Sequence, residues 1–331
     1  MSDDARYKLT VFRAHTWGVL IAALFVVAVF VFALHMQGER GQPSARQPAQ
    51  SASDKDTETE MPAAVLVALA LPVSLIILSY GWLGGVTASG GRVFGFPRPQ
   101  AAWWTHLDVF AVFLFYLVLT GLCGLTIGMG SVDLLLAADS VIKLAMAGLM
   151  LRVIRARGQD ASAALGLQLR GLARPLISGL AVFCAFLPVL VAVRYGWQWV
   201  LEWCNDGALD HVQQSVRLLG KSQSVPVVAQ LAVAAVLVAP VVEEMFFRGL
   251  LYGTLKRHVR PAFAMAAVGV LFGLVHPPVA AQIPMCLFGA LLCYIYEKTG
   301  RLMVPVAIHL LFNLYSIGLI ISMRLFPGGG P

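Results

Sequence analysis

The chain has 331 residues, of which 59% are hydrophobic and only 12% are charged, and its net charge is +7. This composition excludes a water-soluble globular protein, because too few polar side chains are present to cover the surface of a globule. The charge does not indicate nucleic-acid binding, because Lys and Arg gather at the ends of apolar spans and no basic helix with interleaved aromatic residues is present. We therefore predict a polytopic membrane protein whose partner is the lipid bilayer, with no nucleic-acid partner.

The first part of the chain combines one apolar span with a polar segment. Residues 16–34 come close to the roughly 20 apolar residues that cross a bilayer as a helix, and no convincing small-residue cleavage site follows them. We expect residues 1–34 to form an N-terminal anchor. Residues 35–61 are rich in Gln, Ser, Ala and charged residues without apolar periodicity, which predicts a disordered linker.

Apolar segments continue through the rest of the chain. Those within residues 62–194 are interpreted as accessory transmembrane helices. Residues 195–226 keep aromatic and aliphatic residues at helical spacing among polar ones, which predicts an interfacial helix or a cap. We predict an all-α transmembrane bundle of about nine membrane segments. These lie near residues 16–34, 62–86, 107–130, 134–151, 175–193, 227–255, 262–276, 282–297 and 302–323.

The Lys and Arg residues outside these segments are distributed unevenly. Most of them fall on one side of the membrane if the N-terminus is placed in the cytoplasm. Because cytoplasmic loops carry an excess of Lys and Arg, we predict a cytoplasmic N-terminus and an external C-terminus, in a bacterial cytoplasmic membrane.

Several ionisable residues lie inside the predicted spans. A charged side chain at the centre of a membrane helix costs roughly 2.5–3.5 kcal/mol, so such residues face partners or a watered cavity. Asp139 and Lys143 are four residues apart on one helix face and are interpreted as a structural pair. Glu244 and Arg248 have the same spacing and predict a local ion pair. Glu243 is rotated from Glu244 by about 100° and points elsewhere.

Two later segments carry polar residues of a different kind. The segment ending at His276 is short, and Pro277, Pro278 and Pro284 follow it, which predicts a broken helix near the site. His309 and Asn313 lie one helical turn apart, so that their side chains can converge on one metal, water or carbonyl oxygen. These polar groups on separate late helices predict a functional site within the membrane.

Three short motifs in the last third of the chain resemble a known family. "EEMFFR" at 243–248, "FGLVH" at 272–276 and "HLLFN" at 309–313 match the EExxxR, FxxxH and HxxxN motifs of the CPBP family, the CAAX proteases and bacteriocin-processing enzymes. The stretch "YEKTGRLMVPVAIH" before the last motif is also similar to that family. The resemblance covers about residues 225–320 and identifies 227–323 as a CPBP-like catalytic helix bundle.

The resemblance implies an intramembrane endopeptidase that cuts a membrane-anchored protein or peptide, of the type that removes the C-terminal three residues of prenylated CAAX proteins. Carried over by position, Glu243 would be the catalytic base, with Glu244 and Arg248 as its supporting pair. The histidine of the second motif would help to hold the attacking water, and the two polar residues of the third would face the developing oxyanion. The chemistry is coherent, because a carboxylate can take a proton from water and side-chain donors can stabilise an oxyanion.

A metal ion is a further possibility at these positions. Glu243, His276 and His309 have the donor types of a zinc site with a water in the fourth position. The same residues could equally act without metal, through water activated by the glutamate. The sequence leaves both mechanisms open.

Two other functions compete with the peptidase. The protein could be a catalytically silent membrane scaffold or immunity protein that binds a partner, although every motif residue is present, which favours catalysis. It could also be a transporter that uses Glu243 and the histidines as a proton relay. Against a transporter, no inverted pair of broken hydrophobic segments is found in the two halves of the chain.

Overall fold

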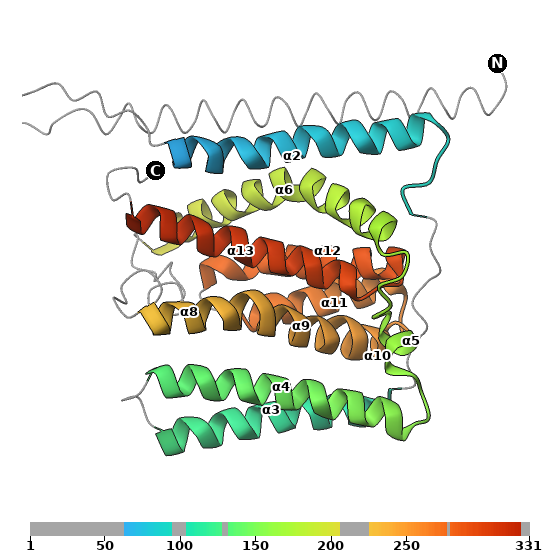
Figure 1. The fold of residues 1–331 in the computed structure, drawn as a ribbon, viewed down its shortest axis with the longest axis vertical. Coiled ribbons are helices and arrows are strands. Elements are labelled where there is room, and N and C mark those ends of the chain that lie inside the picture. Colours follow the sequence, from blue (N-terminus) through green and yellow to red (C-terminus); the bar gives the residue numbers. More distant parts are fainter. Residues whose placement is uncertain (1–62, 95–103, 128–131, 206–224, 277–278, 326–331) are drawn as a thin grey trace, which may run out of the picture. The chain divides into compact units, whose positions relative to one another are not determined.

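The structure, a computed structural model, describes residues 63–94, 104–127, 132–205, 225–276 and 279–325. Within these ranges the regular elements are all helices (Figure 1). The chain divides into two compact units, of which one comprises residues 1–91 and 321–331 and the other residues 92–320. The first unit contains α2 (Ala63–Ala88) and the last described residues of the chain. All the candidate site residues belong to the second unit.

The second unit is a bundle of helices, and α13 continues from it into the first unit. Residues 225–255 form one continuous helical rod in which two π-helical segments, η1 and η2, alternate with α-helical ones. The rod consists of α8 (Val225–Val233), η1 (Ala234–Val238), α9 (Ala239–Glu244), η2 (Met245–Tyr252) and α10 (Gly253–Leu255). The other helices are α3 (His106–Ile127), α4 (Val132–Ala156), α5 (Ala161–Leu165), α6 (Ala173–Asn205), α11 (Pro261–Leu274), α12 (Val279–Thr299) and α13 (Met303–Leu325).

The predicted fold class, an all-helical membrane bundle, is confirmed. Every predicted segment from 62–86 onward corresponds to a helix or to the rod, whereas the anchor 1–34 and the linker 35–61 lie outside the described residues. Several helices are long and apolar enough to cross a bilayer, and the other matching helices are shorter and apolar. The long ones are Leu134–Ala156, Ala173–Cys204, Pro226–Leu255 and Val279–Thr299.

One helix crosses the predicted boundary after residue 194. Helix α6 continues to Asn205, so the first part of the predicted segment 195–226 extends this helix, and residues 206–224 lie outside the described part of the chain. A side-chain contact supports the extension, because the Nε1–H of Trp197 donates to the backbone oxygen of Val279 at 2.8 Å. The exposed rings of Trp199 and Trp203 on the same extension are typical of the headgroup level of a membrane.

The interruption between the two helices near the site is shorter than predicted. Helix α11 ends at Leu274 and α12 begins at Val279, whereas Pro277 and Pro278 lie outside the described residues. Pro284 does not contribute to the break, because it lies inside α12. It is close to the start of that helix, where the missing N–H removes a single backbone hydrogen bond.

Helices α11 and α12 approach each other closely through glycines. Gly269 and Gly273 are four residues apart on α11, and a Cβ atom at Gly269 would lie 2.6 Å from the backbone oxygen of Cys286. On α12, a Cβ atom at Gly289 would lie 2.8 Å from the Cβ atom of Phe272. Such small-residue contacts let membrane helices pack backbone against backbone. The contact fixes the end of α11, where the FxxxH motif lies, against α12.

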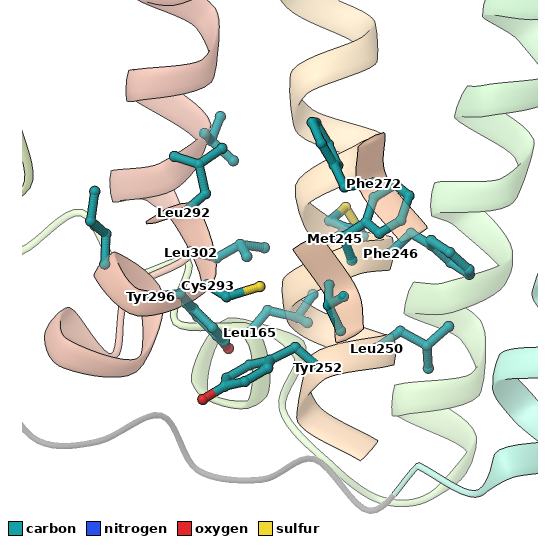
Figure 2. Packing of buried hydrophobic residues seen from close by; sticks show 14 of the residues in the cluster. Leu165, Met245, Phe246, Leu250, Tyr252, Phe272, Leu292, Cys293, Tyr296 and Leu302 are labelled. Carbon is teal, nitrogen blue, oxygen red and sulfur yellow. The ribbon is translucent and has the colours of Figure 1, made fainter. Parts of the chain in front are cut away.

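The apolar core joins the rod to the helices around it. Tyr252 of η2 and Tyr296 of α12 lie side by side, with ring centroids 6.5 Å apart (Figure 2). Leu165 of α5 belongs to the same cluster and lies against Gly249, where an added Cβ atom would meet its side chain at 2.6 Å. The η2 segment of the rod is therefore packed against both α12 and α5.

Candidate active site

Glu244 and Arg248 form a fully buried ion pair. Arg248 Nη1 lies 2.8 Å from Glu244 Oε1, and both side chains are 0% exposed. Arg248 Nη2 also donates to the backbone oxygen of Gly289 at 3.0 Å, and its guanidinium lies 4.7 Å from the ring centroid of Phe272. The predicted pair is thus present, and it ties the rod to both α12 and α11.

His309 of α13 completes this cluster. Its Nδ1 lies 2.9 Å from Glu244 Oε1, and because a carboxylate oxygen accepts, Nδ1 is the donor. The ring is almost fully buried, with Phe272 at 5.8 Å and Phe288 at 5.6 Å between ring centroids. One oxygen of Glu244 therefore accepts from two side chains on two different elements, which fixes His309 and leaves its Nε2 for another partner.

Glu243 and His276 form a second, more open cluster. Their side chains are 21% and 23% exposed, and Glu243 Oε2 lies 3.7 Å from His276 Nε2. His276 Nδ1 lies 2.5 Å from the backbone oxygen of Phe272, so that Nδ1 carries a hydrogen. In the neutral ring Nε2 is then an acceptor that faces another acceptor. The distance between them is too long for a direct hydrogen bond.

Asn313 lies one helical turn beyond His309 on α13, but the two side chains have different partners. Asn313 Nδ2 donates to the backbone oxygen of Ala235, in the π-helical segment η1, at 2.8 Å. His309 is turned toward Glu244. The structure therefore does not bring these two side chains onto one shared partner, and each retains a further nitrogen or N–H for a reactant.

The predicted zinc ligands do not assemble into a metal site. Among the described residues, no group of three or more His, Cys, Asp and Glu side chains is arranged to hold a metal ion. Glu243 and His276 face each other, whereas His309 is bonded to Glu244 through its Nδ1. Both histidines bond through Nδ1, as metal-binding histidines commonly do, but the three side chains do not converge. The arrangement as it stands does not fit zinc.

Phe272 links the two clusters. Its ring lies 4.4 Å from the ring of His276 and 5.8 Å from that of His309, measured between centroids. The same ring lies under the guanidinium of Arg248. The sequence interpretation treated Phe272 only as part of a motif and overlooked Gly289. The i, i+4 spacing of Gly269 and Gly273 was the signal that could have indicated the close α11–α12 contact.

The candidate site lies in the part of the chain that is similar to known proteins. Residues 225–315 match the family model described as "Type II CAAX prenyl endopeptidase Rce1-like". The chain is also 25% identical over 150 residues to "Putative membrane peptidase YdiL" of Bacillus subtilis (strain 168). That alignment covers 45% of this chain and 59% of the relative's length. No solved structure matches the chain.

These matches confirm the CPBP resemblance for the last third of the chain. All six candidate site residues, from Glu243 to Asn313, lie within the matched range. Helices α3, α4 and α6 lie outside it. The match to a membrane peptidase family and the apolar helices together indicate an integral membrane protein.

Proposed function

We propose that this protein is an intramembrane endopeptidase that hydrolyses a peptide bond of a membrane-associated protein through water activated by Glu243. The proposed substrate class is a CAAX-type prenylated protein. One observation carries the proposal: Glu243 Oε2 faces His276 Nε2 at 3.7 Å, beside a carboxylate that is bonded to Arg248 and His309 through one oxygen. The match of residues 225–315 to the prenyl endopeptidase family supports the substrate class.

The proposed first step is the attack of water on the scissile carbonyl. A water molecule between the two side chains donates one hydrogen bond to Glu243 and one to the neutral ring of His276. Glu243 takes a proton as the water oxygen bonds to the carbonyl carbon. The same proton then passes to the leaving nitrogen as the C–N bond breaks. The products are a carboxylic acid and an amine, and Glu243 returns to its ionised form.

The Glu244 cluster has a different proposed role. Glu244 holds His309 through Nδ1, so that Nε2 of this ring is directed away from the carboxylate. When that nitrogen also carries a proton, it can donate to the developing oxyanion, and the charge of Glu244 stabilises the protonated ring. Asn313 has a second N–H besides the one bonded to Ala235. Donors of this kind stabilise the tetrahedral intermediate of acyl transfer.

The test uses the purified protein in detergent and a farnesylated peptide with a C-terminal CAAX sequence. We expect the wild type to cleave the peptide and Glu243→Gln and His276→Ala to lower kcat by at least about 100-fold, with thermal stability close to that of the wild type. Glu202→Gln on α6 is the matched control, because Glu202 lies outside both clusters and bonds to Gln198. A Glu243→Gln variant with the wild-type rate would contradict the mechanism. A wild type that binds the peptide without cutting it would favour the scaffold.

Metal dependence is tested on the same preparation. Because the three predicted zinc ligands do not form one group, we expect no stoichiometric zinc by elemental analysis. We also expect cleavage to survive dialysis against EDTA. Zinc bound in a one-to-one ratio, lost together with activity on dialysis, would show that the two histidines rearrange around a metal.

A further inference from the structure

The pair formed by Asp139 and Lys143 on α4 lies within a larger polar group. Lys143 Nζ lies 2.6 Å from Asp139 Oδ2, and the side chains are 21% and 33% exposed, respectively. The hydroxyl of Tyr116 on α3 donates to the other carboxylate oxygen of Asp139 at 3.3 Å. Asp139 is therefore held from two sides, and it anchors the Lys143 ammonium in an otherwise apolar span.

The face of α4 that carries Lys143 is directed toward the rod. Met146 and Met150 follow Lys143 at helical spacing, and both are buried in the core cluster together with Val242 and Met245. Helix α4 packs against α9, which ends with the Glu243–Glu244 pair, and against η2, which follows it (Figure 1). Lys143 and Glu243 carry opposite charges on the two sides of this interface, close enough to attract each other but too far apart for a direct ion pair.

Within the described part of the chain, the permanent cation bonded directly to either of the two glutamates is Arg248. Arg248 is bonded to Glu244 and to the backbone of Gly289. Among the described residues, the basic group within ion-pair distance of Glu243 is the ring of His276, which is an acceptor at Nε2 when neutral. A second carboxylate beside Glu244 inside a membrane is costly without a counter-charge.

We propose that Lys143, while bonded to Asp139, also attracts Glu243 over a longer distance and acts as a positioning residue, which directs this carboxylate toward His276. The inference rests on the proposed function for its consequence in catalysis. It makes α4, which lies outside the matched residues 225–315, part of the active site. The bundle matched to the family is then incomplete without this accessory helix.

The first test measures the coupling between the two charges without any substrate. Thermal unfolding in detergent is followed for Lys143→Met, Glu243→Gln and the double variant. We expect Lys143→Met to lower Tm clearly in the wild-type background and by a smaller amount in the Glu243→Gln background, because one of its two attractions is already absent there. The control is Lys143→Met combined with Glu297→Gln, since Glu297 pairs with Lys256 and distant sites are additive. Equal losses of Tm in the wild-type and Glu243→Gln backgrounds would overturn the inference.

The second test measures cleavage of the farnesylated CAAX peptide. We expect Lys143→Met to lower kcat by about tenfold or more with KM nearly unchanged, and Lys143→Arg to recover most of the rate because it keeps the charge. A Lys143→Met variant with wild-type kcat would overturn the positioning role. The two proposals fail separately. If the wild type leaves the peptide uncut, the proposed function fails, and the Tm coupling still decides whether Lys143 and Glu243 interact.

Discussion

Two adjacent glutamates in this protein have opposite surroundings. Glu244 is 0% exposed and accepts hydrogen bonds from Arg248 and His309 through one oxygen. Glu243 is 21% exposed, and its Oε2 lies 3.7 Å from Nε2 of His276. The rotation of about 100° between successive helical residues produces this difference. One carboxylate is directed into the packed interior, and the other lies in a partly exposed position beside His276.

This difference suggests that Glu244 contributes mainly to stability and Glu243 mainly to the proposed reaction. A buried carboxylate is tolerated only when its partners replace the lost hydration, and removal of one partner is then strongly destabilising. Glu244 has such partners from the rod and from α13. Glu243 has a loose contact with His276 and a longer-range attraction to Lys143, which keeps its bond to Asp139, so the substitution of Glu243 leaves fewer groups unpaired. Variants of the two clusters are therefore expected to differ in which property they change.

The largest expected effect on stability is that of Arg248→Met. The variant leaves Glu244 fully buried without its guanidinium partner, and we expect a loss of about 3–5 kcal/mol in the free energy of unfolding. Glu243→Gln, in contrast, is expected to change that free energy by less than about 1 kcal/mol. Chemical or thermal unfolding in detergent measures both. Equal losses for the two variants would remove the distinction between the clusters.

A second prediction concerns the glycine contact that holds both clusters in place. In Gly273→Ala, the new Cβ atom would lie 2.5 Å from the backbone oxygen of Gln282 and 2.8 Å from the backbone nitrogen of Cys286. Backbone atoms cannot move aside easily, so we expect a loss of about 1–3 kcal/mol. Cleavage should also decrease, because His276 lies three residues farther along the chain.

The matched control for this variant is Gly253→Ala. Gly253 is also a buried helical glycine, but the nearest atom to an added Cβ there is the backbone oxygen of Arg248 at 3.8 Å, an ordinary contact. Replacing a helical glycine by alanine without a clash is stabilising by up to about 1 kcal/mol. A loss of stability in Gly253→Ala as large as that in Gly273→Ala would mean that close packing of α11 on α12 is not the cause.

The sequence predicted the local parts of this arrangement. Hydropathy located the long described helices but not the short α5, and the i, i+4 spacing predicted the Glu244–Arg248 pair. Both successful predictions depend on the geometry of a single helix. The bond between His309 and Glu244 joins residues 65 positions apart, and its formation depends on how α13 packs against the rod. The same reason explains why Lys143, interpreted from the sequence as part of a structural pair, was not associated with Glu243.

The π-helical segments could not be predicted for a related reason. A 3.6-residue periodicity describes the rod as one α-helix and gives no sign that η1 and η2 have wider turns. The acceptor of Asn313, the backbone oxygen of Ala235, lies in η1. Sequence motifs therefore identified Asn313 as a candidate, and the fold was needed to identify the backbone group that it bonds.

The smallest expected effect on stability is that of Asn313→Ala. The variant removes one hydrogen bond, to a backbone oxygen in η1, and we expect a loss of about 0.5–1.5 kcal/mol. If the second N–H of Asn313 donates to the oxyanion, kcat also decreases by about 100-fold or more while KM changes little. Unfolding and steady-state cleavage on one preparation separate these two contributions. A variant that shows the expected loss of stability but retains full kcat would exclude Asn313 from the reaction and leave it as a support for η1.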